Sequence, residues 1–135
     1  MERAVDYRVS IQRNAKRIAE MHARIHELSA RRGNPECGRL WGLACAEFHA
    51  SYDALAFPGG YGSALTRLAG NDAETIEAAL VFLELRPYFF RSGYMRETLL
   101  RRLKQVAMSE HQRKRFEAVC AAQRLWRANR KKTIR

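Results

Sequence analysis

The segment AALVFLELRPYFFRSGYM, Ala78 to Met95, sets the architecture of the whole chain. Its first six residues, through Leu83, are all apolar, so a helix formed from them is apolar on every side and must be surrounded by other elements. Pro87 cannot continue that helix. After it come Tyr88, Phe89, Phe90 and Tyr94, interleaved with Arg86, Arg91 and Arg96. The sequence therefore predicts a central buried helix over 72–86 that ends in a corner both aromatic and cationic.

Apolar residues recur every three, four or seven positions on both sides of this segment, which is the pattern of amphipathic helices. The spacing predicts helices over about 5–32, 35–55, 63–69 and 93–106, and a last helix that begins after Ser109. No run alternates apolar and polar β-branched residues as a strand would. We therefore expect an all-α fold: a compact bundle, or a short helical-solenoid-like array, of five to six helices with antiparallel hairpins.

Residue types at the ends of these segments indicate where the helices begin and stop. Gly33 ends the first helix. The expected helix starts are Asn34 with Pro35, Asn71 with Glu74, and Ser109 with Gln112. The apolar face of the last helix is expected at Phe116, Val119, Ala122 and Trp126. We expect residues 1–135 to form a single domain, with residues 129–135 as a frayed basic tail.

The composition, 47% hydrophobic and 29% charged, is that of a soluble globular protein. The N-terminal sequence MERAVDYRVS lacks the apolar core of a signal peptide. The longest apolar run, six residues, is far shorter than the roughly 20 needed to span a bilayer. The cysteines at 37, 45 and 120 show no CxxC spacing and indicate reduced thiols. We therefore expect a cytoplasmic protein that does not enter a membrane.

Charge is distributed unevenly along the chain, whose net charge is +11. Residues 1–32 carry eight Lys or Arg and four Asp or Glu, a net charge of +4. Residues 33–85 carry two and seven, a net charge of −5, and residues 86–135 carry fifteen and three, a net charge of +12. Such segregation is typical of a surface that binds a polyanion. The acidic middle is either a second docking surface or folds against the basic ends.

Four side chains have the spacing of a metal site. His22 and His26 lie four apart in the first predicted helix, and Cys45 and His49 lie four apart in the second, so each pair shares a helix face. In an antiparallel hairpin the two pairs could form a tetrahedral zinc site. However, His26 and His49 lie about 90° off the apolar faces of their helices. We therefore expect no metal and no other cofactor.

Two further patterns bear on phosphate binding and catalysis. The segment FPGGYGSALT, residues 57–66, has glycines before a helix but lacks both the P-loop and the dinucleotide-binding motifs, so a helix-to-helix connection is predicted. No Ser, Cys or Lys lies in a recognisable nucleophile motif, and Glu47, Asp53 and Glu84 have no spacing that pairs them. We expect a protein that is not an enzyme, with a catalytic site assembled from distant residues as the third alternative.

The last third of the chain supplies the expected binding surface. Phe89 and Phe90 are expected in the core, because Phe is mostly buried, and Tyr88 and Tyr94 at the surface. The candidate contacts to a polyanion are Arg91, Tyr94, Arg96, Arg101, Arg102, Lys104, Arg113, Arg124, Arg127 and Lys131. Arginine and lysine neutralise phosphates, and an exposed tyrosine stacks on an unpaired base.

These observations favour a helical binding module whose basic C-terminal third engages a polyanion, with nucleic-acid backbone as the favoured ligand. The alternative is a protein–protein interaction module, an adaptor or an inhibitor, whose basic face steers it toward an acidic protein partner. The two classes differ in their partner and in how strongly binding depends on salt.

Overall fold

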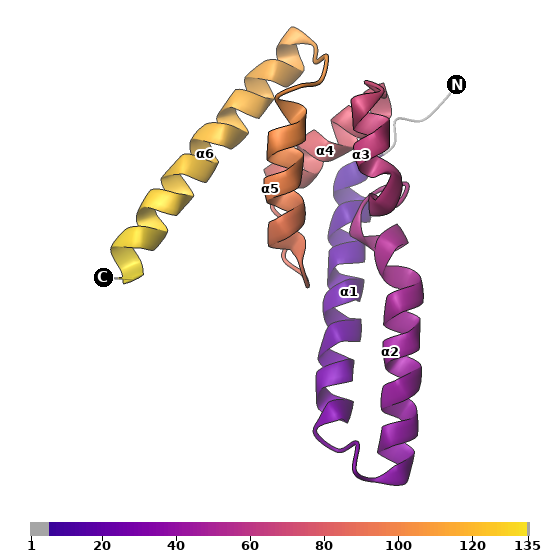
Figure 1. The fold of residues 1–135 in the computed structure, drawn as a ribbon. Coiled ribbons are helices and arrows are strands. Elements are labelled where there is room, and N and C mark those ends of the chain that lie inside the picture. The colour runs from indigo at the N-terminus through magenta and orange to yellow at the C-terminus, as the bar shows by residue number, and fades with distance from the viewer. Residues whose placement is uncertain (1–5, 135) are drawn as a thin grey trace.

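The computed structural model describes residues 6–134, with side chains through residue 130, and this part of the chain contains helices and no strand. The helices are α1 (Tyr7–Ser29), α2 (Pro35–Ala56), α3 (Tyr61–Ala69), α4 (Ala73–Leu85), α5 (Ser92–Leu103) and α6 (Glu110–Ile134) (Figure 1). The all-α architecture expected from the apolar periodicity is confirmed. None of these described helices combines the length and the apolarity needed to cross a bilayer.

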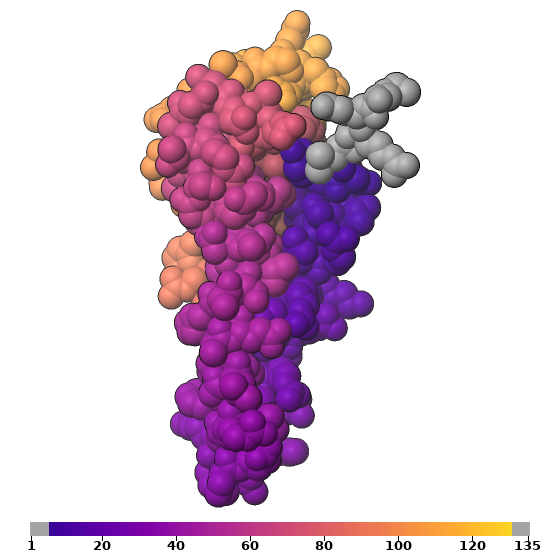
Figure 2. Space-filling view, turned by 90° about the vertical axis from the view of Figure 1, so that its right-hand side faces the viewer, coloured from indigo at the N-terminus to yellow at the C-terminus, as the bar shows by residue number. Residues whose placement is uncertain are grey.

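Helices α1 and α2 form the antiparallel hairpin that the short turn at Gly33 and Asn34 predicts (Figure 1). Asn34 caps α2 as expected, because its Oδ1 accepts hydrogen bonds from the backbone N–H groups of Glu36 and Cys37 at 3.0 and 3.2 Å. The turn of the hairpin projects away from the other helices, and the molecule narrows toward it (Figure 2). The hairpin therefore joins the rest of the fold at the end where α1 begins and α2 ends.

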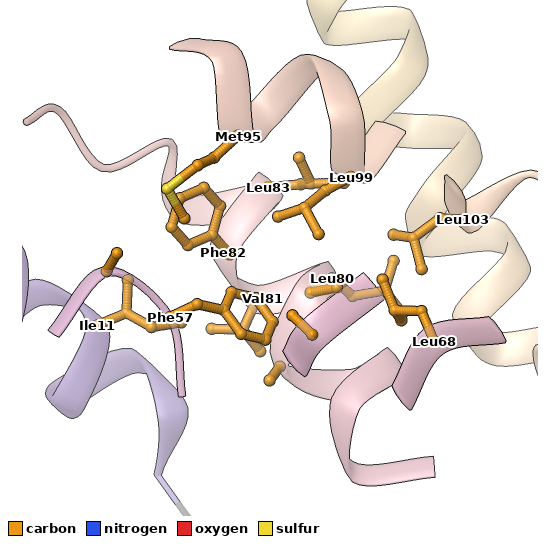
Figure 3. Close-up of a cluster of buried hydrophobic side chains, with 14 of the residues drawn as sticks. Ile11, Phe57, Leu68, Leu80, Val81, Phe82, Leu83, Met95, Leu99 and Leu103 are labelled. Carbon is orange, nitrogen blue, oxygen red and sulfur yellow. The ribbon is translucent and has the colours of Figure 1, made fainter. Parts of the chain in front are cut away.

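Helix α4 lies at the centre of the hydrophobic core, as predicted. Every residue from Ala78 to Leu83 is buried. Figure 3 shows the side chains of α4 surrounded by Ile11 of α1, Phe57, Leu68 of α3, and Met95, Leu99 and Leu103 of α5. Burying one Leu or Phe side chain contributes about 1.5–3 kcal/mol to folding, so this single helix supplies much of the hydrophobic stabilisation.

The glycine-rich connection between α2 and α3 is closed by the protein's own groups. The carboxylate of Asp53 accepts a hydrogen bond from the backbone N–H of Gly62 at 2.7 Å. It thereby occupies the helix N-terminus where a phosphate would bind. Arg67 donates to the carbonyl oxygens of Pro58 and Gly60 at 3.1 and 2.8 Å. The segment is a helix-to-helix connection, as its lack of phosphate-binding motifs predicts.

Two helix starts test the capping signals. Ser109 and Gln112 form the expected reciprocal pair, each side chain accepting from the other residue's backbone N–H at 3.1 Å. The N-cap of α4, by contrast, is Asp72 rather than the expected Asn71. Asn71 has a left-handed φ of 58°, and its Oδ1 accepts a hydrogen bond from the backbone N–H of Ala107 at 2.9 Å. Because that long-range bond occupies the Asn71 side chain, Asp72 caps α4 instead.

An ion-pair cluster holds α6 against α4. Arg115 donates to both carboxylate oxygens of Glu77 at 2.9 Å and to Glu84 at 2.7 and 3.0 Å. The hydrogen bond from Arg115 lowers the pKa of Glu84, and the same bond raises the pKa of Arg115. Gln112 adds a hydrogen bond to Glu77 at 3.1 Å. Two acids of the acidic middle therefore fold against the basic end of the chain.

The apolar face expected along α6 comprises Phe116, Val119, Ala122 and Trp126. The expectation is wrong for its second half, because Ala122 is exposed and Trp126 is 39% exposed. The buried residue there is Gln123, whose amide accepts from Arg86 at 2.7 Å and donates to Glu97 at 3.5 Å. Beyond this point α6 diverges from the other helices (Figure 1). It continues to Ile134, so residues 129–134, expected to fray as a tail, are helical in the structure.

Candidate functional site

The corner between α4 and α5 is bounded by two arginines in a left-handed backbone conformation. Arg86 ends α4 with a φ of 51°, and Arg91 precedes α5 with a φ of 68°. Across this corner, the hydroxyl of Ser92 accepts from the backbone N–H of Phe89 at 3.1 Å, and the Phe89 carbonyl accepts from the Ser92 N–H at 2.9 Å. These bonds fix the turn and set the directions in which its side chains leave.

The two phenylalanines of this corner have different environments. Phe89 is buried as expected, whereas Phe90 is 42% exposed, so the expectation that both lie in the core is wrong for Phe90. The side chains leave one tight turn in different directions, and only Phe89 reaches the core. The Phe90 carbonyl accepts a hydrogen bond from the hydroxyl of Tyr52 at 2.5 Å. The Phe90 ring stacks on the imidazole of His22, with ring centroids 4.9 Å apart and planes 25° apart.

The exposed rings of the corner open onto a cleft of about 670 Å³ between α1, the corner and the end of α6. Tyr88 and Tyr94 are 91% and 76% exposed, as expected, and both line it. The remaining lining residues are Ala19, His22, Ala23, residues 89–93, Arg96, Glu97, Trp126 and Arg130. We call this hollow the aromatic cleft. Its charged side chains are three arginines, at 91, 96 and 130, and one acid, Glu97.

Trp126 forms one wall of the aromatic cleft and has three arginines around its ring. The guanidinium carbons of Arg86, Arg130 and Arg96 lie 4.1, 5.4 and 5.9 Å from the centroid of the Trp126 ring. Within about 6 Å, a guanidinium over an indole is attracted by about 0.5–2 kcal/mol, depending on its exposure to water. These contacts hold Trp126 over the cationic edge of α4 and α5, outside the apolar core.

Arg86 and Arg96 are half-buried, and within the described residues neither forms an ion pair. Arg86 donates through Nη1 to the neutral amide of Gln123 at 2.7 Å. Its Nη2, and Nε of Arg96, are buried and meet no hydrogen-bond acceptor in the described part of the chain. Burial lowers the pKa of both guanidinium groups, and the charge of Arg96 lowers that of Arg86 further. Buried charges without an anionic partner are costly, so an anion bound beside them would be stabilised.

A second hollow, of about 320 Å³, lies between α5 and α6, and we call it the basic groove. Its lining residues are Glu97, Leu100, Arg101, Lys104, Cys120, Gln123, Arg124 and Arg127. Arg127 donates to both carboxylate oxygens of Glu97 at 2.6 Å, so the single acid of the groove is already paired. Because Glu97 also lines the aromatic cleft, the two hollows adjoin.

The structure brings together seven of the ten residues expected to contact a polyanion. Arg91, Tyr94 and Arg96 line the aromatic cleft, while Arg101, Lys104, Arg124 and Arg127 line the basic groove. Arg102 lies beside Leu68 and Ala69 instead, because adjacent residues of a helix point about 100° apart. Arg113 lies in the first turns of α6, about 16 Å before Arg124 along the helix. The side chain of Lys131 lies outside the described residues.

The four candidate metal ligands have other neighbours. His22 contacts His26 edge to face, with ring centroids 4.6 Å apart, in addition to its stack on Phe90. His49 is exposed, and its ring lies edge to face with the ring of Phe48, with ring centroids 6.2 Å apart. Cys45 is half-buried. Among residues 6–130, no group of three or more His, Cys, Asp or Glu side chains is arranged to hold a metal ion.

Sequence reasoning did not select Arg86, Trp126 and Arg130 as site residues. Trp126 and Arg130 are four residues apart and therefore share a helix face, which was the available signal. Arg86 gave no comparable signal, because its contacts with Gln123 and Trp126 join helices far apart in the sequence.

Comparison with known proteins gives this chain no relative. No protein-family model, curated protein or solved structure matches it. The function is therefore inferred from the chemistry of the aromatic cleft and the basic groove.

Proposed function

We propose that this protein is a non-enzymatic helical module that binds the backbone of a nucleic acid through its C-terminal third. One observation carries the proposal: the basic groove presents four cations, and its single acid is already bound to one of them. Arg101, Lys104 and Arg124 therefore have charge available for an external anion. Phosphates along a nucleic-acid backbone meet such a row of cations with affinity and little sequence preference.

Two observations favour nucleic acid over an acidic protein as the partner. Four of the seven acids of the acidic middle are already in ion pairs and so are less available as a second docking surface: Glu77 and Glu84 with Arg115, Glu47 with Arg17, and Glu36 with Arg39. Exposed aromatic rings also adjoin the groove, and carboxylates of a protein partner would leave the faces of Tyr88 and Tyr94 unused. A polymer that carries both phosphates and planar bases complements both hollows.

The proposal is tested by the salt dependence of binding to a short oligonucleotide. The triple variant Arg101→Gln, Lys104→Gln and Arg124→Gln removes the three available cations of the groove. We expect it to weaken binding and to reduce the slope of log K against log salt by up to about three units, since each neutralised phosphate releases about one counterion. The slope is measured by fluorescence anisotropy over a series of salt concentrations.

A matched control removes the same charge from another face. Arg13 and Arg24 of α1, and Arg31 in the turn that follows it, are exposed, and none of them lines the aromatic cleft or the basic groove. Their triple Gln variant should keep most of the wild-type slope. If the wild type shows no salt-dependent binding even at about 50 mM salt, where non-specific binders still associate, the proposal is wrong and an acidic protein becomes the candidate partner.

A further inference from the structure

The aromatic cleft combines two chemical features, exposed aromatic rings and cationic charge. The first is a pair of tyrosine rings, Tyr88 and Tyr94, that are almost fully exposed. They line the same hollow as the partly exposed rings of Phe90 and Trp126. Aromatic groups gathered at one hollow of a monomer mark a binding site, because leaving them in water is unfavourable. A nucleobase stacked on one such ring contributes about 1–3 kcal/mol to binding.

The second feature is cationic charge that forms no ion pair within the described residues. Arg96 and Arg130 line the cleft, and Arg86 lies behind Trp126 with its guanidinium 4.1 Å from the ring. Arg86 and Arg96 each keep a buried nitrogen that meets no acceptor in the described part of the chain. The one acid in the cleft, Glu97, is held by Arg127. Glu97 offsets part of the charge of Arg86 and Arg96 but forms no ion pair with either, so an anion that enters the cleft would meet arginines that the fold compensates only in part.

We propose that the aromatic cleft is a single-strand site, which takes an unpaired base and the phosphate attached to it. The base stacks on Tyr88 or Tyr94, the phosphate faces Arg96 and Arg130, and the strand continues past Glu97 into the basic groove. This inference rests on the proposed function and adds the class of nucleic acid, single-stranded rather than duplex.

Duplex nucleic acid uses only part of this surface. Its bases are already stacked on one another on both faces and paired at their edges, so they have no free face for a tyrosine. A duplex can therefore reach the cations of the groove through its phosphates, and the cleft stays empty. Single strands gain both contributions, so removing the rings of the cleft should weaken single-strand binding and leave duplex binding unchanged.

The test compares a 12-nucleotide single strand with its own duplex for two double variants. Tyr88→Leu with Tyr94→Leu keeps apolar side chains but removes the rings, whereas Tyr88→Phe with Tyr94→Phe keeps the rings. We expect the Leu variant to lose at least tenfold in single-strand affinity, the equivalent of one stack, and to bind duplex as the wild type does. The Phe variant should retain wild-type affinity for both. Both tyrosines are exposed, so circular dichroism should show the fold unchanged.

A second measurement reads the cleft directly. The chain has two tryptophans, Trp41 and Trp126. Trp41 lies near the turn of the hairpin, with the guanidinium carbon of Arg32 5.5 Å from its ring centroid, and does not line the cleft. In a Trp41→Phe background, the fluorescence of Trp126 should change on adding the single strand at saturation and should be unaffected by duplex.

The possible results separate the two proposals. If no nucleic acid of either form binds, both are wrong. If single strand and duplex bind equally, and the Leu variant and the fluorescence of Trp126 show no difference between them, the single-strand inference is wrong while backbone binding stands. If the Phe variant loses as much single-strand affinity as the Leu variant, hydroxyl contacts replace stacking and the inference is likewise wrong.

Discussion

Arg86 and Arg91 each adopt a left-handed backbone conformation that costs an L-residue about 1–2 kcal/mol relative to glycine. At Arg91 the surrounding hydrogen bonds fix the turn: the Tyr52 hydroxyl donates to the Phe90 carbonyl, and Phe89 and Ser92 bind each other. The strain lies on the two arginines that flank the aromatic rings of the cleft. Strained residues of this kind occur where a fold holds side chains in place for binding.

A substitution at Arg91 tests this strain. We expect Arg91→Gly to be more stable than Arg91→Ala by about 1 kcal/mol, because glycine accepts a positive φ and alanine does not. The control is Arg24, an exposed residue inside α1, where the order should reverse and Ala should be more stable by about 1 kcal/mol. Urea denaturation measures the four free energies of unfolding. If Ala were the more stable at both positions, the left-handed backbone at residue 91 would be wrong.

At the scale of elements, the docking of α6 on α4 depends on carboxylates that must stay ionised. The hydrogen bond from Arg115 lowers the pKa of Glu84 below its ordinary value of 4.5. A carboxylate whose pKa is lower in the folded state binds fewer protons there than in the unfolded chain. Its contribution to stability is therefore complete above the unfolded pKa and is lost as the pH falls through the folded pKa.

The pH dependence of stability checks this docking. We expect the wild type to lose stability as the pH drops below about 4.5, and Glu84→Gln to be less stable at pH 7 but to show a smaller loss over the acid range. Glu117→Gln, at an exposed position of α6, makes the same charge change at a residue that forms no ion pair with Arg115 and should keep the wild-type pH dependence. Thermal melts from pH 3 to pH 7 give the comparison. An unchanged acid loss in Glu84→Gln would contradict the ion pair.

Much of the element layout was predictable because it depends on local patterns. The apolar run of Ala78 to Leu83 identified the central helix, and Ser109 with Gln112 marked the start of α6. Two of the errors share one physical cause, a polar contact between residues far apart in the sequence. Asn71 is withdrawn from capping by the N–H of Ala107. The buried face of α6 runs through a glutamine because Arg86 and Glu97 satisfy its amide. From the sequence, the basic and aromatic residues of the cleft could be named but not arranged in space. Trp126 forms a wall of the cleft through contacts with residues far away in the sequence, such as Arg86.

At the scale of the whole molecule, stability is concentrated at one end. α4 is enclosed by its neighbours, whereas the turn between α1 and α2 projects away from the other helices (Figure 2), and only Phe48 and Ala56 of α2 are buried. Local opening costs little free energy where few apolar contacts must break. The hairpin turn and the second half of α6 should therefore open without the core.

Hydrogen exchange followed by mass spectrometry tests this distribution. We expect peptides from 76–83 to exchange only through global unfolding, and peptides from 30–40 and 124–134 to exchange orders of magnitude faster. A destabilising core change such as Leu80→Ala should accelerate exchange in α4 while leaving the hairpin turn nearly unaffected, since the turn opens independently. Uniform protection along the chain would show instead that the hairpin and α6 unfold only together with the core.

Helix α6 carries its fold-supporting residues and its cleft residues in separate halves, and this has a genetic consequence. The buried residues of α6, Phe116 and Gln123, precede Trp126 and Arg130. A nonsense codon placed directly after Gln123 would therefore spare the described core and delete one wall of the cleft. Such an allele would yield normal amounts of a folded protein whose cleft lacks Trp126 and Arg130, whereas missense alleles in α4 would lower the amount of protein itself. Mutations in one gene would thus fall into two phenotypic classes, one that lowers the amount of folded protein and one that removes part of the cleft.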